Sequence, residues 1–536
     1  MTPVRALCLI SFLMTYSYEP QVRAASRPTE PSSPSDSNLV LMSLSAHPDD
    51  EDGATLAYYA KIKGVKTYSL FFTRGEGGQN EIGAELNEDL GAIRTKETLE
   101  AAKILASEVY FLGYPDFGFS KTAKETFAMW GGKDSILARL VYYIRALKPD
   151  LIISNYDTVT TRPNSQHGNH QAVGITAFEA FEKAADPTFH SEQIRGPITA
   201  WQVQKLYSRF YKRDSLPLPP DVTTIDVEQR IGSGQTIEEL AISALQEHRS
   251  QGLGRLALES IPPVFRQHAY RVIREHQTFP RRAGDLFSGI RPAPRQRAQV
   301  VSLFPKFTTA PAPNAATHVH AVVRDPLHLG FVRTYDDAIE HVLTGFHIPF
   351  QPIDSVQLAD GDLSEFSTII LDLRAYFYRH DLPKSNRRLL EYVRSGGNVV
   401  CFYHKPPDWN GKDIAPFPIT LTGERVTEEN AQITILNPSH PFFVHPNQIN
   451  DSDWAGWTQE RSVYLPSDDT LKTSARYERL LSMSDEDEHQ PSTSLLWATY
   501  GKGTFTYCSL VLYRQLKIFN GGAIKLLFNM ISQPRN

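Results

Sequence analysis

The stretch LVLMSLSAHPDDE, residues 39–51, decides the fold that the sequence predicts. Its first eight residues, LVLMSLSA (39–46), form a short apolar run typical of a buried strand. The segment DGATLAYYAKIKG (52–64) follows at once, with the apolar spacing of an amphipathic helix that ends at Gly64. A buried strand that passes directly into a helix indicates the start of a βαβ unit, in which parallel strands are joined by helical crossovers.

The same alternation of strand-like and helix-like segments continues along the chain. A mostly parallel sheet with helices on both faces accounts for this order, which assigns the chain to the α/β class. We expect strands at KTYSLFFT (66–73), VYFLGY (109–114), DLIISNY (150–156) and Val203–Tyr207, and helices over 89–106, 135–147, 171–181 and 238–251.

A length of 536 residues exceeds what one hydrophobic core usually organises, so more than one domain is expected. Residues 291–316 contain RPAPRQR and TTAPAPNAA, a composition typical of a linker. Beyond it the alternation restarts with FSTIILDLRAY, SNRRLLEYVRSGG, NVVCFYH and GTFTYCSLVLY. We therefore predict one α/β domain over residues 38–290, a linker over 291–316 and a second α/β domain over 317–536.

The first 24 residues resemble a signal peptide. Arg5 supplies a positive charge, Ala6–Tyr16 is a short apolar stretch, and Val22-Arg23-Ala24 fits a small-x-small cleavage site. The apolar stretch is shorter than the roughly 20 residues that span a bilayer, which disfavours a membrane anchor. Residues 25–37 are rich in Ser and Pro and are expected to be a disordered tether. The sequence thus predicts export to a periplasmic or extracellular location, with no integral membrane segment after signal removal.

Charge and cysteine content exclude two classes of protein. The formal net charge of −5 argues against a nucleic-acid partner, because phosphate recognition needs a basic face. The three cysteines include no CxxC pair, and Cys8 lies in the predicted signal peptide. Cys401 and Cys508 lie in strand-like runs, where they could form a disulfide after export or remain two buried free thiols. The fold is not a disulfide scaffold.

Two clusters of ionisable residues follow predicted strands. AHPDDE (46–51) ends the first strand, and HGNH (167–170) follows the fourth. Ligands of open α/β sheets bind outside the carboxyl ends of the strands, so both clusters should meet in one crevice. Capping of the next helix by Asp49 or Asp50 is the structural alternative. One Asp and two His around a zinc ion, with one position open for water, is the pattern of a catalytic metal site.

These motifs, in this order, resemble the PIG-L/LmbE-like zinc deacetylases. The resemblance covers about residues 38–255 and includes TRGEGGQNEIG (73–83), an R-x-x-E pair, LGYPD (112–116) and EHRSQG (247–252). Members of that family remove N-acetyl groups from glucosaminyl-phosphatidylinositol and from the mycothiol precursor. The resemblance implies a Rossmann-like three-layer domain and a zinc-dependent N-deacetylase that acts on an N-acetylated sugar or glycoconjugate.

The resemblance also implies which residues bind the metal and which one is the general base. His47, Asp50 and His170 would hold Zn²⁺. Asp49 would be the general base that takes a proton from water bound to the metal. This division of labour is chemically coherent, because zinc makes hydroxide available near neutral pH and a carboxylate beside that water completes general-base catalysis.

Three further residues receive roles by the same resemblance. His167 would assist the tetrahedral intermediate or protonate the leaving amine, and Arg94 and Asp116 would contact substrate. A purely structural pair of Arg94 with Glu97, three residues further on a helix, is the alternative for the arginine. Many relatives have Pro-Asp where this chain has Gly168-Asn169. The amide of Asn169 carries no charge, which leaves the proton chemistry at His167 open.

The second predicted domain resembles the glutamine-amidotransferase-like domain that is fused to some exported members of the family. An amidotransferase needs a nucleophilic Cys on a sharp turn after a strand, followed by a His. The corresponding turn here carries Arg374-Ala375-Tyr376, and Cys401 and Cys508 lie inside strands. We predict a non-catalytic domain that binds carbohydrate, covers the deacetylase pocket or mediates self-association; the oligomeric state stays open.

Two other functions remain alternatives to a zinc N-deacetylase. One is a carbohydrate-binding pseudoenzyme that keeps a metal without turnover, and the other is a zinc hydrolase of a different amide or ester. Asp49 favours catalysis over simple binding, since a metal site alone would not need a free carboxylate beside the water.

Overall fold

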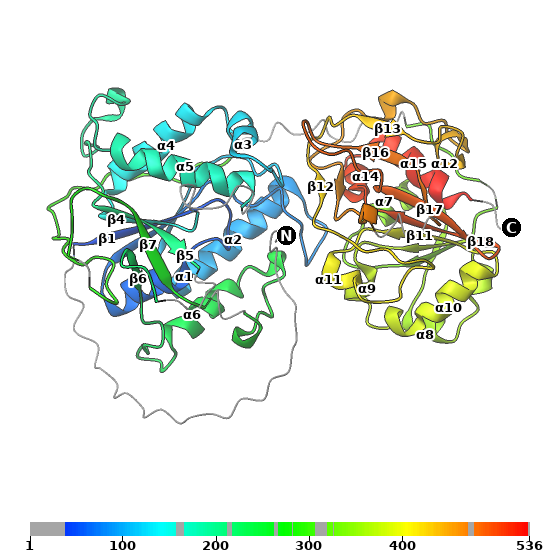
Figure 1. The fold of residues 1–536 in the computed structure, drawn as a ribbon, viewed down its shortest axis with the longest axis horizontal. Coiled ribbons are helices and arrows are strands. Elements are labelled where there is room, and N and C mark those ends of the chain that lie inside the picture. The colour runs from blue at the N-terminus through cyan, green and yellow to red at the C-terminus, as the bar shows by residue number, and fades with distance from the viewer. Residues whose placement is uncertain are drawn as a thin grey trace. The chain divides into compact units, whose positions relative to one another are not determined.

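The computed structural model describes residues 38–156, 166–211, 217–261, 266–280, 282–305, 319–324, 326–469 and 476–533. The predicted signal peptide (1–24) and tether (25–37) lie outside the described residues. The chain divides into two compact units, Met1–Phe307 and Thr308–Asn536. Each unit is a mixed α/β structure, as the sequence predicts (Figure 1). No helix among the described residues is long and apolar enough to cross a membrane.

The first unit is built on a seven-stranded sheet in its described part, with the strand order β3-β2-β1-β4-β5-β7-β6. Strands β1 to β5 are parallel to one another. Strands β7 and β6 extend the sheet beyond β5 with antiparallel pairing, which the sequence patterns did not predict. The strands are β1 Val40–Ser45, β2 Lys66–Phe71, β3 Glu108–Phe111, β4 Leu151–Ser154, β5 Lys205–Phe210, β6 Val222–Thr224 and β7 Ala269–Glu275.

Helices pack on both faces of this sheet (Figure 1). Val40, Met42 and Leu44 of β1 point toward α3, α4 and α5, while Leu41 points toward α1, α2 and α6, so β1 is buried on both sides. The helices are α1 Gly53–Ala57, which continues as a π-helical turn Tyr58–Ile62, α2 Asn87–Leu105, α3 Ala123–Met129, α4 Lys133–Leu147, α5 Gly168–Lys183 and α6 Ile237–Leu245, with 3-10 turns at Ser191–Gln193, Arg249–Gln251 and Leu258–Ser260.

A buried arginine closes the carboxyl end of α5. The Arg145 guanidinium, on α4, is fully buried and donates to the carbonyl oxygens of Lys183 (3.1 Å) and Ala184 (3.2 Å), among others. These carbonyls have no partner inside the helix and carry its negative dipole end, which a cation stabilises. Because α5 begins at the HGNH motif, this contact anchors the helix whose other end carries His170.

Two segments differ from their predicted extents. Helix α6 ends at Leu245 rather than at residue 251, because the chain then turns through Arg249–Gln251 and Ser250 becomes buried among side chains of α2. Part of the predicted linker also runs along the first unit: the Leu303 amide donates to the Phe111 carbonyl beside β3 (2.8 Å), and Val300 is buried. Residues 306–318 lie outside the described part of the chain.

The second unit has a second seven-stranded sheet in its described part, ordered β15-β17-β18-β11-β10-β8-β9. Strands β9, β8, β10, β11 and β18 are parallel, and helices cover both faces. The strands are β8 Leu329–Val332, β9 Phe350–Pro352, β10 Thr368–Leu371, β11 Asn398–Phe402, β15 Glu478–Arg479, β17 Leu495–Tyr500 and β18 Gly503–Cys508. Two small ladders pair β12 Arg425–Val426 with β14 Ser462–Val463, and β13 Ile433–Ile435 with β16 Leu481–Met483.

The helices of the second unit divide between the two faces of its sheet. One face holds α7 Ala338–Gly345, α12 Pro441–Val444, α14 Leu512–Lys517 and α15 Gly521–Ile531. The other face holds α8 Ser355–Ala359, α9 Ala375–Tyr378, α10 Leu382–Arg394 and α11 Pro406–Trp409, with a 3-10 turn at Leu363–Glu365. The likeness of this unit to an amidotransferase stays a prediction.

Cys401 and Cys508 are buried free thiols, so of the two alternatives left by the sequence the disulfide is not formed. The parallel register places Cys401 opposite Tyr507 and Phe402 opposite Cys508. The two thiols therefore point to opposite faces of the sheet, and Cys401 packs in one hydrophobic cluster and Cys508 in the other. Burial raises the pKa of Cys508 to about 12 and the pKa of Cys401 well above its usual value.

This geometry predicts that neither strand thiol reacts in the native protein. Iodoacetamide at neutral pH should leave Cys401 and Cys508 unmodified, because each is fully buried and held in the neutral form. Both should be alkylated after unfolding in urea, which serves as the positive control. Peptide mass spectrometry reads out both states, and rapid native alkylation of either residue would contradict the burial assigned here.

Candidate active site and metal centre

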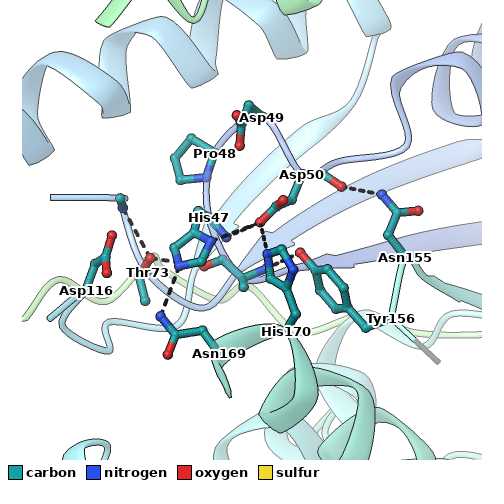
Figure 2. Close-up of polar contacts among 12 residues, drawn as sticks. His47, Pro48, Asp49, Asp50, Thr73, Asp116, Asn155, Tyr156, Asn169 and His170 are labelled. Atoms are coloured by element: carbon teal, nitrogen blue, oxygen red, sulfur yellow. Dashed lines mark hydrogen bonds and ion pairs between the residues drawn. The ribbon is translucent and has the colours of Figure 1, made fainter. Parts of the chain in front are cut away.

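The two ionisable motifs meet where the strand order of the first sheet reverses. From β1 the chain adds β2 and β3 on one side and then returns to add β4 on the other side of β1. The loops that leave β1 and β4 therefore diverge at the carboxyl edge of the sheet, the position at which open α/β sheets bind ligands. AHPDDE occupies the loop after β1, and HGNH opens α5 on the chain that follows β4. The predicted meeting of the motifs is what the structure shows (Figure 2).

The Asp50 carboxylate lies between two imidazoles at this point. Its Oδ2 atom is 3.1 Å from Nδ1 of His47 and 3.2 Å from Nε2 of His170, and it accepts the His47 backbone amide at 2.9 Å (Figure 2). Burial alone would raise the pKa of Asp50, but the imidazoles, His170 foremost, hold that pKa well below its usual range. An ionised carboxylate flanked by two ring nitrogens is a donor set suited to a divalent transition metal.

His167 lies beside the same point. Nitrogens of His47, His167 and His170 lie within 4.8 Å of one another, a group that could hold a metal ion. The His167 and His170 ring centroids are 3.7 Å apart, and Tyr156 stacks on the far side of His170 at 4.2 Å. The predicted ligands His47, Asp50 and His170 therefore gather at one point. His167, predicted to assist proton transfer, is close enough to be a further ligand.

Asp49 occupies an unusual backbone position and does not cap the following helix. Its φ angle is 85°, in the left-handed region that residues with a side chain rarely adopt. The cap of α1 is Asp52, which accepts the Thr55 amide at 3.3 Å. Burial, followed by the charge of Asp50, raises the pKa of Asp49 to about 7, although His248 and Arg94 oppose the rise. Such a carboxyl group can exchange a proton near neutral pH.

Asn169 holds the second nitrogen of the His47 ring. The fully buried amide places Nδ2 3.1 Å from His47 Nε2, and its Oδ1 accepts the hydroxyls of Ser120 (2.9 Å) and Thr126 (2.8 Å). Burial disfavours the protonated ring, but the carboxylates of Asp116 and Asp50 outweigh burial and raise the pKa of His47 to about 9. Asn169 is thus a neutral group that orients His47. Ser120 and Thr126 carried no motif that could have singled them out.

Arg94 is engaged with the protein rather than open to the crevice. It is buried, and it donates to the carbonyl of Gln79 (2.9 Å) and to the Ser250 hydroxyl (3.2 Å). Glu97 accepts the amide and the hydroxyl of the same Ser250, at 2.8 and 2.7 Å. Arg94 and Glu97 therefore both bind Ser250, which favours a structural role for the R-x-x-E pair.

Asp116 lies beside the metal-binding group together with a residue that the sequence patterns did not single out. Its Oδ1 accepts the Gly118 amide at 2.9 Å, and its charge raises the pKa of His47. Glu76 packs next to it: burial, then Asp116, raise the pKa of Glu76 to about 7. A Cβ on Gly77 would lie 2.4 Å from the Asp116 carbonyl oxygen, so only glycine lets this loop approach closely enough to bring Glu76 there.

The EHRSQG motif, left without a role by the sequence, also contacts the AHPDDE loop. His248 is fully buried, with Nε2 3.1 Å from Glu51 Oε1, and Gln251 donates to the carbonyl of Pro48 at 2.8 Å. Glu51 and His248 thus belong to the site although neither received a role from the sequence. The sequence could have indicated them only through their membership of AHPDDE and EHRSQG, two motifs that carry the family resemblance.

Comparison with known proteins gives a match for the part of the chain that contains AHPDDE and HGNH. Residues 42–181 match the model of the PIG-L family, GlcNAc-PI de-N-acetylase. Mycothiol S-conjugate amidase of Streptomyces coelicolor is 32% identical over 183 residues, which are 32% of this chain and 60% of the amidase. The match thus spans less than two thirds of that enzyme.

Two further proteins are similar to part of this chain. The 1D-myo-inositol 2-acetamido-2-deoxy-alpha-D-glucopyranoside deacetylase of Saccharomonospora viridis is 25% identical over 232 residues, 39% of this chain and 84% of that protein. The structure of N,N'-diacetylchitobiose deacetylase from Pyrococcus horikoshii aligns at 20% identity and a TM-score of 0.31, covering 44% of this chain and 83% of that one. Residues 42–181, which contain both ionisable motifs, form a PIG-L family domain.

Proposed function

We propose that this protein is a zinc-dependent hydrolase that removes an N-acetyl group from an amino-sugar-containing substrate. The observation that carries the proposal is the Asp50 carboxylate between His47 and His170, with Asp49 beside it at a pKa of about 7. The names of the similar proteins, two deacetylases and an amidase, support cleavage of an amide bond. Asp49 favours this function over a pseudoenzyme that only binds carbohydrate.

His47, Asp50 and His170 would hold the metal, with His167 close enough to join them. When bound, zinc would polarise the amide carbonyl and lower the pKa of a water ligand to about 7. Asp49 takes a proton from the attacking water at its carboxylate. His167 then donates a proton to the nitrogen of the leaving amine. Asp49 is left protonated and His167 neutral, and proton exchange with solvent returns both side chains to their starting forms.

Asp116 lies beside the His47 ring and suits a substrate with hydroxyl and N–H donors. Its carboxylate oxygens can accept hydrogen bonds from such groups. Of the two residues predicted to contact substrate, Asp116 is therefore the better supported, while Arg94 is committed to Gln79 and Ser250. We assign the substrate to the amino sugars and their conjugates.

The second unit and the location of the protein complete the proposal. Arg374 follows β10 at the turn where an amidotransferase would carry its nucleophilic cysteine, and Asp408 binds it at 2.8 and 3.2 Å. We assign no covalent chemistry to this amidotransferase-like unit. Export to the periplasm or the extracellular space remains part of the proposal, on the strength of the first 24 residues alone.

Removal of a ligand histidine should remove metal and activity together. His47→Ala and His170→Ala should each lose zinc, measured by elemental analysis, and acetate release from N-acetylglucosamine-containing substrates, because a three-ligand site does not survive the loss of a ligand. His489→Ala is the matched control, since the side chain of His489 is 82% exposed. Full metal retention in both ligand variants would refute the assignment.

Replacement of Asp49 should separate metal binding from turnover. Asp49→Asn should keep zinc and lose roughly 10²- to 10⁴-fold in kcat, the usual contribution of a positioned base. Zinc content and acetate release are measured on the same preparation. If Asp49→Asn loses the metal while Asp50→Asn keeps it, the two aspartates have been assigned the wrong way round.

The stability of the metal-free protein should reveal the unusual environment of Asp49. A pKa of about 7, against an ordinary 3.8, means that the folded state binds a proton that the unfolded state releases between these values. The Asp49 contribution to the free energy of unfolding therefore falls as pH rises from about 4 to about 7. Asp49→Asn should gain stability relative to the wild type over this window, measured by thermal melts with a chelator present.

Asp52 provides the control with the opposite sign. Burial alone would raise its pKa, but Arg209 holds it below 3.8, so the Asp52 contribution is present at neutral pH and is lost in acid. Asp52→Asn should therefore lose stability relative to the wild type as pH rises. A pH-independent difference between Asp49→Asn and the wild type would show that Asp49 titrates normally.

A further inference from the structure

The backbone conformation of Asp49 needs an external restraint. A left-handed φ of 85° is unfavourable for a residue with a side chain and persists only where the surroundings enforce it. The direction of the Asp49 carboxylate depends on this angle, since φ sets how the Cα substituents are turned relative to the peptide group that precedes them. The groups that hold this peptide are therefore part of the site.

The peptide group between Pro48 and Asp49 is held at both ends. Its carbonyl oxygen, on Pro48, accepts Nε2 of Gln251 at 2.8 Å. Its N–H, on Asp49, donates to Oε2 of Glu51 at 3.0 Å. Oε1 of the same Glu51 is in turn 3.1 Å from Nε2 of the fully buried His248. Two residues beyond Pro48, the carbonyl of Asp50 accepts the side-chain amide of Asn155 (Figure 2).

The segment that supplies Gln251 and His248 is itself fixed. Ser250, between them, accepts from Arg94 and donates its amide and hydroxyl to Glu97, at 2.8 and 2.7 Å. Its carbonyl accepts the Glu81 amide at 2.8 Å. Residues 248–251 thus connect helix α2 and the loop 73–83 to the AHPDDE loop. Gln251, which donates to Pro48, belongs to this hydrogen-bonded segment.

We propose that Gln251 is a positioning residue for Asp49, acting with Glu51 and His248 as a clamp on the Pro48–Asp49 peptide. The clamp turns the Asp49 carboxylate toward the reacting water, which assigns a role to the EHRSQG motif. This inference rests on the proposed function for the role of Asp49 as base. The existence of the clamp does not depend on that function and can be measured separately.

The test replaces the donor without changing the volume. Gln251→Met keeps a side chain of similar length and shape but cannot donate to Pro48. Hydrogen–deuterium exchange of a peptide covering residues 44–53 should become faster in this variant, because the Pro48–Asp49 peptide group loses the hydrogen bond that holds its carbonyl and is then held only through its N–H, by Glu51. Zinc content should stay at the wild-type level, since the ligand side chains of His47, Asp50 and His170 do not contact Gln251 in the structure. Gln251→Lys, which keeps a donor of similar reach, should restore part of the protection.

Activity and a matched control complete the design. Gln251→Met should lower kcat roughly 10- to 100-fold with little change in KM, the usual cost of misplacing a reacting group. In an Asp49→Asn background the same substitution should have no further effect on kcat, because Gln251 acts through Asp49. Gln246→Met is the control: Gln246 donates to the Leu256 carbonyl at 2.7 Å, a similar contact on the same segment that does not reach the AHPDDE loop.

Two outcomes would overturn the inference. Unchanged exchange of the 44–53 peptide in Gln251→Met would show that Gln251 does not restrain the Pro48–Asp49 peptide group. A loss of kcat that persists in full in the Asp49→Asn background would show that the substitution has a general structural effect and does not act by positioning Asp49. Absence of acetate release by the wild type would refute the proposed function, and the exchange measurement would then decide on the clamp alone.

Discussion

The first unit depends on one partly buried charge that joins the ends of two neighbouring strands. Asp50 follows β1, and its partner His170 lies 120 residues further along the chain, on the helix that follows β4. A buried carboxylate is tolerated only where donors compensate it, so the parallel pairing of β1 with β4 and the position of α5 must both be correct for Asp50 to remain ionised. Arg145 binds the carboxyl end of α5 and so helps to hold this helix in position.

Local pattern was sufficient to predict the strands that carry the site. β1, β2 and β4 are buried apolar runs in the centre of the sheet, and such runs are recognisable in sequence. The ionisable clusters at their carboxyl ends follow from the geometry of parallel sheets, which is why AHPDDE and HGNH could be placed together without a structure. Strands β6 and β7 were not predicted, because both are partly exposed and their antiparallel pairing near one edge of the sheet depends on long-range contacts.

The contacts that organise the site beyond its ligands could not be predicted from spacing. Ser250 lies 153 residues from Glu97, and Asn169 lies 122 residues from His47. No local periodicity brings such pairs together, and each side chain is of a type that is commonly exposed. The glycines at 77 and 78 illustrate the same limit, because no local pattern indicates that a Cβ on Gly78 would lie 2.5 Å from the Arg94 guanidinium.

The two sheets place different chemistry at the corresponding point of their topology. In the second sheet the strand order reverses between β8 and β10, the position at which β1 and β4 carry the ionisable cluster in the first. Thr334, after β8, donates its amide and hydroxyl to Asp372, after β10, at 3.1 and 2.7 Å, and Arg374 is bound by Asp408. These polar groups pair with one another, but burial, followed by the charge of Asp336, raises the pKa of Asp372 to about 7, as the pKa of Asp49 is raised in the first sheet. A displaced carboxyl pKa is therefore common to both units. The difference lies in the histidines: among the described residues, the group of side chains that could hold a metal ion, His47, His167 and His170, belongs to the first sheet.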